Sequence, residues 1–167
     1  MSMLPRLRRN TRGTAAAEMA LVMPLLLILM MGSVELGNYF YNEHILVKAV
    51  RDGARYAARQ NFTNYSCSGA IGGTVATDTK NIVMTGLLTG GTPRLASWNA
   101  STISVTHACA TTANGTALSG IYRGAATGAP VVTVSASVPY VPVLESFGFR
   151  GTGLSLNANQ QAAVMGI

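Results

Sequence analysis

Residues Thr14 to Val34 read TAAAEMALVMPLLLILMMGSV, a run of 21 residues that contains a single charged side chain, Glu18. A helix of this length extends about 31 Å, which is close to the thickness of the hydrocarbon core of a membrane. The run is longer than the apolar part of an ordinary cleaved signal peptide, and the GSVELG that follows offers a poor cleavage site. The stretch therefore predicts a helix that remains in the membrane.

Basic residues are concentrated before this run. Arginine occupies positions 6, 8, 9 and 12, and no further arginine occurs before Arg51. By the positive-inside rule, the N-terminus stays in the cytoplasm and the chain after about Glu35 is exported. Without residues 1–13 the formal charge falls from +6 to +2, with 8 basic and 6 acidic groups remaining. The positive charge belongs mostly to the N-terminal tail, so no nucleic-acid partner is expected.

The segment from Ser33 to Gln60 continues with helical periodicity. Small and apolar residues recur at three- and four-residue steps, namely Ile45, Ala49, Val50, Gly53, Ala54 and Ala57. The opposite side of this predicted helix carries Lys48, Arg51, Asp52, Arg55 and Arg59. A single helix from Thr14 to Gln60 would be about 70 Å long. We interpret the three arginines as a solvated face, with a partner- or lipid-binding stripe as the alternative.

The remaining chain predicts a small sheet. Residues 61–73 are rich in Asn, Ser, Gly and Thr and predict a loop, and residues 77–88 predict a short second helix that Gly90 and Gly91 end. Alternation of apolar and polar residues then predicts strands around 103–107, 132–138 and 154–158, with a short helix or turn over 143–149. Three or four antiparallel strands packed on the long helix indicate an α+β fold.

The residues that open the apolar run match a known pattern. Residues 13–18 read GTAAAE, the form of a type IV prepilin signal, with glycine before the cleavage point and glutamate at the fifth mature position. The wider stretch, including AVRDGARYAARQ at 49–60, resembles the TadE-like family of minor pilins, or pseudopilins, of the tight-adherence (Flp-type) pilus system. This resemblance covers roughly residues 8–60 and departs from the family at Met19, where an aromatic residue is more usual.

The resemblance implies a division of the chain and a set of partners. A prepilin peptidase would cut between Gly13 and Thr14, which leaves residues 1–13 as a cytoplasmic leader. Residues 14–34 would cross the bacterial inner membrane once, 35–60 would continue the helix into the periplasm, and 61–167 would form a periplasmic, pilin-like α+β domain. The implied partners are the major pilin and sister minor pilins, the peptidase, the inner-membrane assembly platform and membrane lipid. Assembled subunits would also occur in the extracellular pilus.

Glu18 is the costly residue of the apolar run. A carboxylate at the centre of a membrane helix costs about 2.5–3.5 kcal/mol on insertion scales. After cleavage, Thr14 would carry a new α-amino group one helical turn away, and a carboxylate is favoured near that end of a helix. The family resemblance implies an assembly role, in which Glu18 pairs with the amine of an adjacent subunit. The alternative is an interfacial charge at the membrane edge.

Cys67 and Cys109 are the only cysteines, and both follow the predicted span. Two cysteines in an oxidising compartment most simply form one disulfide. His107 lies two residues before Cys109 and raises the alternative of a zinc site, but the only other histidine, His44, belongs to the distant helix. We therefore expect no metal and no cofactor.

Motifs of enzymes are not found in the sequence. There is no G-x-S-x-G, P-loop or dinucleotide fingerprint, and three of the five exported acids fall on the first helix. We expect no catalytic residues and no enzyme. The leading hypothesis is a minor pilin that takes part in pilus assembly and thereby in surface adhesion. The alternatives are a membrane-anchored periplasmic binding module outside the pilus and, third, a secreted enzyme with an unusual signal sequence.

Overall fold

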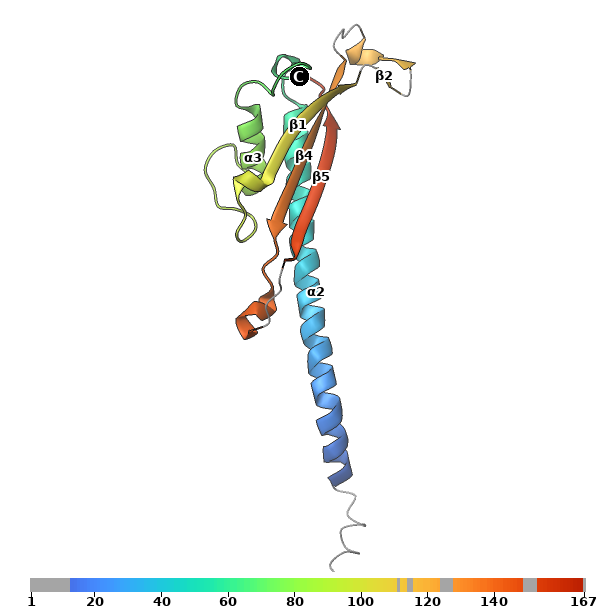
Figure 1. The fold of residues 1–167 in the computed structure, drawn as a ribbon, viewed down its shortest axis with the longest axis vertical. Helices are drawn as coiled ribbons and strands as arrows, with labels where there is room; N and C mark the ends of the chain where they lie inside the picture. Colours follow the sequence, from blue (N-terminus) through green and yellow to red (C-terminus); the bar gives the residue numbers. More distant parts are fainter. Residues whose placement is uncertain (1–12, 111, 114–115, 124–127, 149–152, 167) are drawn as a thin grey trace, which may run out of the picture.

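A single long helix runs most of the length of the molecule (Figure 1). The computed structural model describes residues 13–166 except 111, 114–115, 124–127 and 149–152. Helix α2 (Thr14–Ala58) has 45 residues and continues through Pro24 without a break. The predicted continuous helix is confirmed, and it ends two residues earlier than expected. Its first half extends away from the rest of the chain, whereas its second half carries the folded domain (Figure 1).

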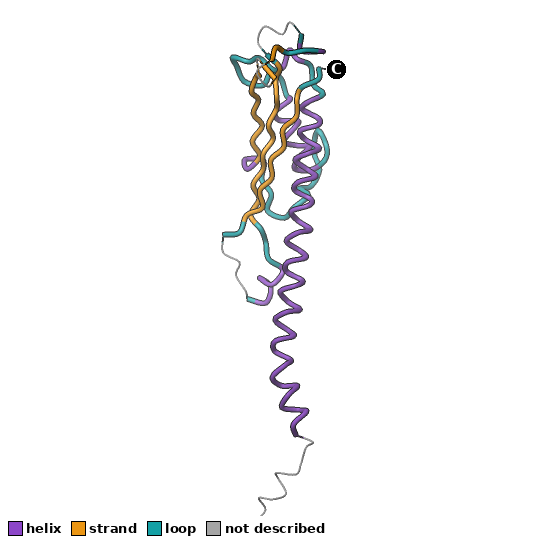
Figure 2. The backbone as a smooth tube through the Cα atoms, turned by 90° about the vertical axis from the view of Figure 1, so that its right-hand side faces the viewer, coloured by secondary structure: helices purple, strands orange, loops and turns teal. Residues whose placement is uncertain are grey.

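The domain is built on a three-stranded antiparallel sheet in the order β1-β4-β5. The strands are β1 (Ile103–Ala110), β4 (Ala129–Pro139) and β5 (Ser155–Ala163). Val105 of β1 lies opposite Val134 of β4, which lies opposite Gln160 of β5. Figure 2 shows the sheet along one side of the second half of α2, with its strands running in the direction of the helix. The predicted α+β fold is confirmed.

The core lies between this sheet and the helix. Alternate side chains of the central strand point inward, so that Val132, Val134, Ala136 and Val138 are buried while the residues between them are partly exposed. Ala49, Ala54 and Ala57 of α2 are also buried, and their small side chains let the helix approach the sheet closely. Tyr65, Trp98 and Tyr140 are buried as well, and the aliphatic side chains that are at most 2% exposed include Leu46, Val50, Val83, Ile103, Leu156 and Val164. Each of these aliphatic side chains contributes about 1.5–3 kcal/mol on burial.

Helix α3 (Val75–Thr85) packs against α2. It ends at Gly86, which has φ 85° and whose backbone N–H donates to the carbonyl of Ile82. The predicted helix over 77–88, stopped by Gly90 and Gly91, was too long at its C-terminal end, because Gly86 already supplies the left-handed cap that ends a helix. The two helices meet at Gly53, where an added Cβ would collide with Cγ2 of Val83. This glycine lets the two helix backbones come close together.

Short elements connect these parts. The predicted loop over 61–73 contains a 3₁₀ turn, η2 (Phe62–Asn64), and a second turn, η3 (Ala100–Thr102), precedes β1. Strands β2 (Thr112–Ala113) and β3 (Thr116–Ala117) pair with each other, and η4 (Gly120–Tyr122) follows them. The segment after β4 forms η5 (Val143–Phe147), in agreement with the short helix or turn predicted over 143–149, of which residue 149 lies outside the described residues.

Candidate functional site

The first half of α2 is exposed along its whole length. Every residue from Thr14 to Met30 is exposed, including Leu21 at 80% and Ile28 at 68%. The most apolar 18-residue window of the helix has a mean hydropathy of 2.2, and none of it is buried. Within the described chain, this is the one helix long and apolar enough to cross a membrane. An apolar surface of this size marks a contact with lipid or with other proteins.

Gly13, Thr14 and Glu18 lie together at the start of this exposed half. Gly13 caps the helix with φ −87° and ψ −18°, and a Cβ built on it meets nothing within 4 Å. Glu18 follows Thr14 by one helical turn, and its side chain is exposed. The described fold therefore needs neither the absence of a side chain at Gly13 nor a carboxylate at position 18.

A hydrogen-bonded clamp joins α2 to the domain directly after the exposed half. The Tyr140 hydroxyl donates to Oε1 of Glu35 at 2.5 Å, and the backbone N–H of Leu144 donates to Oε2 of Glu35 at 3.1 Å. The amide of Asn38 donates to the Tyr140 hydroxyl oxygen at 2.9 Å. Burial, and then the hydrogen bond to Glu35, raise the pKa of Tyr140. These four residues, Glu35, Asn38, Tyr140 and Leu144, are called the boundary clamp below.

Sequence reasoning missed the boundary clamp. The one signal in the sequence that could have indicated it was Glu35, a carboxylate directly after the long apolar run. A charge in apolar surroundings is costly unless it is paired, so Glu35 called for a polar partner. That partner, Tyr140, is 105 residues away in the chain, and no periodicity connects the two. The clamp fixes η5 against α2, below the core in which the helix packs on the sheet.

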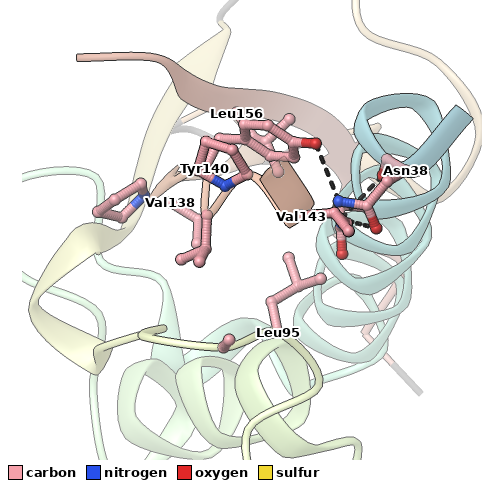
Figure 3. A pocket seen from close by; sticks show the side chains of 11 residues that line it. Asn38, Leu95, Val138, Tyr140, Val143 and Leu156 are labelled. Carbon is pink, nitrogen blue, oxygen red and sulfur yellow. Dashed lines mark hydrogen bonds between the residues drawn. The ribbon is translucent and has the colours of Figure 1, made fainter. Parts of the chain in front are cut away.

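A cavity of about 290 Å³ lies beside the clamp, between α2 and the end of β4 (Figure 3). Its walls are mainly apolar, with Leu95, Val138, Val143 and Leu156 around the polar groups of Asn38 and Tyr140. Those polar groups are already bonded to each other in the clamp. The lining contains no carboxylate, histidine or cysteine. The one titratable side chain in this lining is that of Tyr140, and its hydroxyl is already bonded to Glu35 and Asn38.

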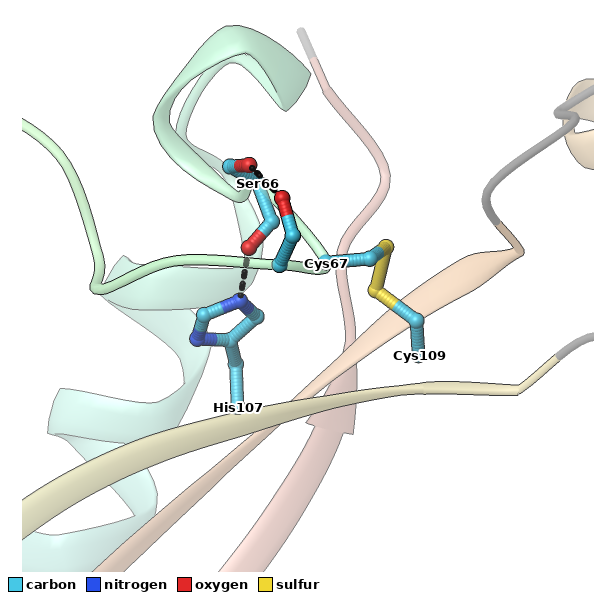
Figure 4. The surroundings of a disulfide bond; sticks show 5 residues. Ser66, Cys67, His107 and Cys109 are labelled. Atoms are coloured by element: carbon cyan, nitrogen blue, oxygen red, sulfur yellow. Dashed lines mark hydrogen bonds between the residues drawn. A yellow bond between two sulfur atoms is a disulfide. The ribbon is translucent and has the colours of Figure 1, made fainter.

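The two cysteines are brought together at the other end of the domain. Cys67 and Cys109 form a disulfide whose Cα atoms are 5.6 Å apart (Figure 4). It ties the loop after α2 to the end of β1. Beside it, Nε2 of His107 lies 3.0 Å from the carbonyl oxygen of Ser66. Tyr65 of the same loop donates its hydroxyl to the Ala57 carbonyl at 2.5 Å, and burial raises the pKa of Tyr65 to about 12.

The other candidate groups of the sequence stay apart. In the part of the chain that the structure describes, no three His, Cys, Asp or Glu side chains lie close enough to hold a metal. The arginine row of α2, at 51, 55 and 59, is exposed. Asp52 on the same helix forms an ion pair with Arg94, in which Nη1 of Arg94 lies 3.4 Å from Oδ2 of Asp52. This pair holds the segment after α3 against α2.

The comparison with protein families finds a match that covers most of α2 and none of the strands. The model of the TadE-like protein family matches residues 13–55. The match begins at Gly13 and includes Glu18 and the helix residues of the boundary clamp, Glu35 and Asn38. The resemblance found from the sequence is confirmed over this segment. No curated protein and no solved structure matches the chain.

Proposed function

From the TadE-like segment at residues 13–55, we propose that this protein is a minor pilin, or pseudopilin, that takes part in assembly of the tight-adherence (Flp-type) pilus and thereby in surface adhesion. The observation that carries the proposal is the form of α2, which is apolar and exposed in its first half and bears a folded domain on its second. Such a helix needs lipid around it before assembly and other helices around it afterwards. A structural subunit of a fibre meets both needs.

The proposed topology has a cytoplasmic leader, an inner-membrane span over 14–34 and a periplasmic part formed by 35–60 and 61–167. The arginines before the span favour this orientation. The disulfide between Cys67 and Cys109 supports it independently, because disulfides form and persist in oxidising compartments such as the periplasm.

Cleavage between Gly13 and Thr14 by a prepilin peptidase is the proposed first step. The φ of −87° at Gly13 is ordinary for any residue, and there is room for a side chain, so the fold has no need of glycine there. A protease cleft at the membrane surface supplies the need, because glycine lets the backbone enter without a side-chain clash. The new α-amino group of Thr14 then lies one turn from Glu18.

Glu18 is the proposed assembly residue. Its carboxylate would pair with the α-amino group of a neighbouring subunit, either the major pilin or a sister minor pilin, within the packed helices of the pilus. Pairing compensates a charge that is otherwise costly in an apolar environment. The inner-membrane assembly platform is the proposed site at which these subunits leave the lipid and enter the fibre. No step in this scheme needs a cofactor or a catalytic residue of this chain.

Replacing Gly13 by phenylalanine should leave residues 1–13 attached, because the bulky side chain blocks entry of the backbone into the cleft. Intact mass of the protein from membranes that contain the peptidase measures this. The matched control is Gly32→Phe, which adds the same side chain to the same helix at another exposed glycine with nothing within 4 Å of its Cβ. That control should be cut normally. Normal loss of residues 1–13 in Gly13→Phe would contradict the assigned site.

A further inference from the structure

Exposed apolar side chains surround the boundary clamp on both α2 and the domain. On the helix they are Leu36, Phe40 and Tyr41, and on the domain they are Val141, Val143 and Leu154, each between 42% and 66% exposed. We call these six residues the apolar collar. In Figure 1 the η5 turn lies beside α2, below the sheet and toward the exposed half of the helix. The collar therefore extends the apolar surface of that half up to the level of the clamp, on both the helix and the domain.

The height of the collar along α2 can be worked out from helix geometry. Leu36 lies about 3 Å beyond Val34 along the helix axis, and Tyr41 lies about 10 Å beyond it. The polar headgroup region on each side of a bilayer is about 5–8 Å thick. If the span ends near Val34, Leu36 lies within the headgroup region. The backbone of Phe40 and Tyr41 lies a few Å beyond it, and their rings tilt toward the helix N-terminus and so back toward the headgroups.

The clamp brings the domain to the same level. Because the backbone N–H of Leu144 donates to the carboxylate of Glu35, the η5 turn is held within the first helical turn after the span. Val143 is next to Leu144 and is exposed. A turn held at this height with its apolar side chains exposed would touch the surface of the bilayer.

We propose that the apolar collar rests in the headgroup layer of the membrane, so that the domain sits directly on the lipid surface before the subunit is assembled. This inference rests on the membrane span of the proposed function. Tyrosine at the edge of the bilayer suits the collar, because its ring is apolar and its hydroxyl stays hydrated. Glu145, the carboxylate of the η5 turn, is exposed and limits the depth to the headgroups, since it is excluded from hydrocarbon.

The test measures the depth of single positions in the membrane. The two native cysteines are joined in the disulfide, so one added cysteine can carry a fluorophore on the full chain. Val143→Cys reports the collar, and Leu27→Cys reports the span. Ile121→Cys is the matched control, because Ile121 is also apolar and exposed. It precedes β4, whereas Val143 follows β4, so the two labels lie at opposite ends of the sheet. Each protein is reconstituted at low density in phosphatidylcholine vesicles that carry a nitroxide at a shallow or a deep position.

We expect the label at 143 to lose fluorescence with the shallow nitroxide and the label at 27 with the deep one, while the label at 121 keeps its fluorescence with both. If 143 behaves like 121 while 27 is quenched, the span is present but the collar does not touch lipid, and the inference is wrong. Loss of quenching at 27 as well would contradict the membrane span of the proposed function. Val141→Cys, at a second exposed collar position, replaces Val143→Cys if that variant does not fold.

Discussion

Replacing Glu18 by glutamine should prevent the subunit from entering pili while leaving its insertion and its cleavage intact. Glutamine keeps the size of the side chain and removes the charge, so insertion becomes no harder. The glycine before the cleavage point and the apolar helix are unchanged. In the fibre, however, the α-amino group of the neighbouring subunit would lose its charged partner in an apolar environment. Breaking one side of a buried ion pair costs about 3–5 kcal/mol, which corresponds to a hundredfold or greater loss of incorporation.

Two measurements check this result, the number of pili per cell and the recovery of partner pilins with the tagged subunit. The matched control is Glu43→Gln, which removes a carboxylate from the same helix beyond the span and should leave both values at the wild-type level. Wild-type values for Glu18→Gln would mean that Glu18 is only a charge at the membrane edge. The proposed assembly mechanism would then lose its central residue.

Removing the disulfide by the double change Cys67→Ala and Cys109→Ala should lower the free energy of unfolding of the domain by about 4 kcal/mol, because a cross-link reduces the conformational entropy of the unfolded chain. The separation of the two cysteines is 42 residues, so the loop that the bond closes includes all of α3. This is a large part of the about 5–15 kcal/mol by which domains are usually stable. The lone tryptophan, Trp98, is buried, and its fluorescence follows denaturant unfolding.

The control for this variant is Ser68→Ala, which shortens an exposed side chain in the same loop and should change the stability little. A thiol assay on the wild-type protein provides a second check. The native, oxidised protein should show no free thiol until it has been reduced and unfolded. Two thiols that react with an alkylating reagent under native conditions would contradict the disulfide.

The elements that could be predicted from the sequence are those with a strong local signal. The long helix follows from an apolar run joined without interruption to a helical repeat of small residues. Strand β4 follows from the alternation of Val132, Val134, Ala136 and Val138, because it is central and one of its faces is buried. The end of α3 was missed because three glycines lie close together at 86, 90 and 91, and periodicity alone does not show which of them caps the helix.

The parts that could not be predicted depend on contacts between distant residues. Nothing in the pattern of the sequence links Glu35 with Tyr140 or Leu144, yet these bonds hold η5 against α2. Gly53 was read as one small residue of a helix face, whereas its role is the close approach of α3. Glu18 stood out as the one charge of the apolar run, whereas its assembly role and the role of Gly13 came only from the family resemblance. In the isolated chain both are exposed, so their roles remain proposals about contacts with other proteins.

The most direct measurement is the N-terminus of the wild-type protein, taken from membranes of cells that contain the prepilin peptidase. Intact mass and N-terminal sequencing determine it together. A mature protein that lacks residues 1–13 and begins at Thr14 is the predicted result. An uncut chain would instead indicate a membrane-anchored binding module, and a cut after about residue 33 would indicate a secreted protein whose signal peptide had been removed. Either of those two results would contradict the proposal that this chain is processed and assembled as a pilin.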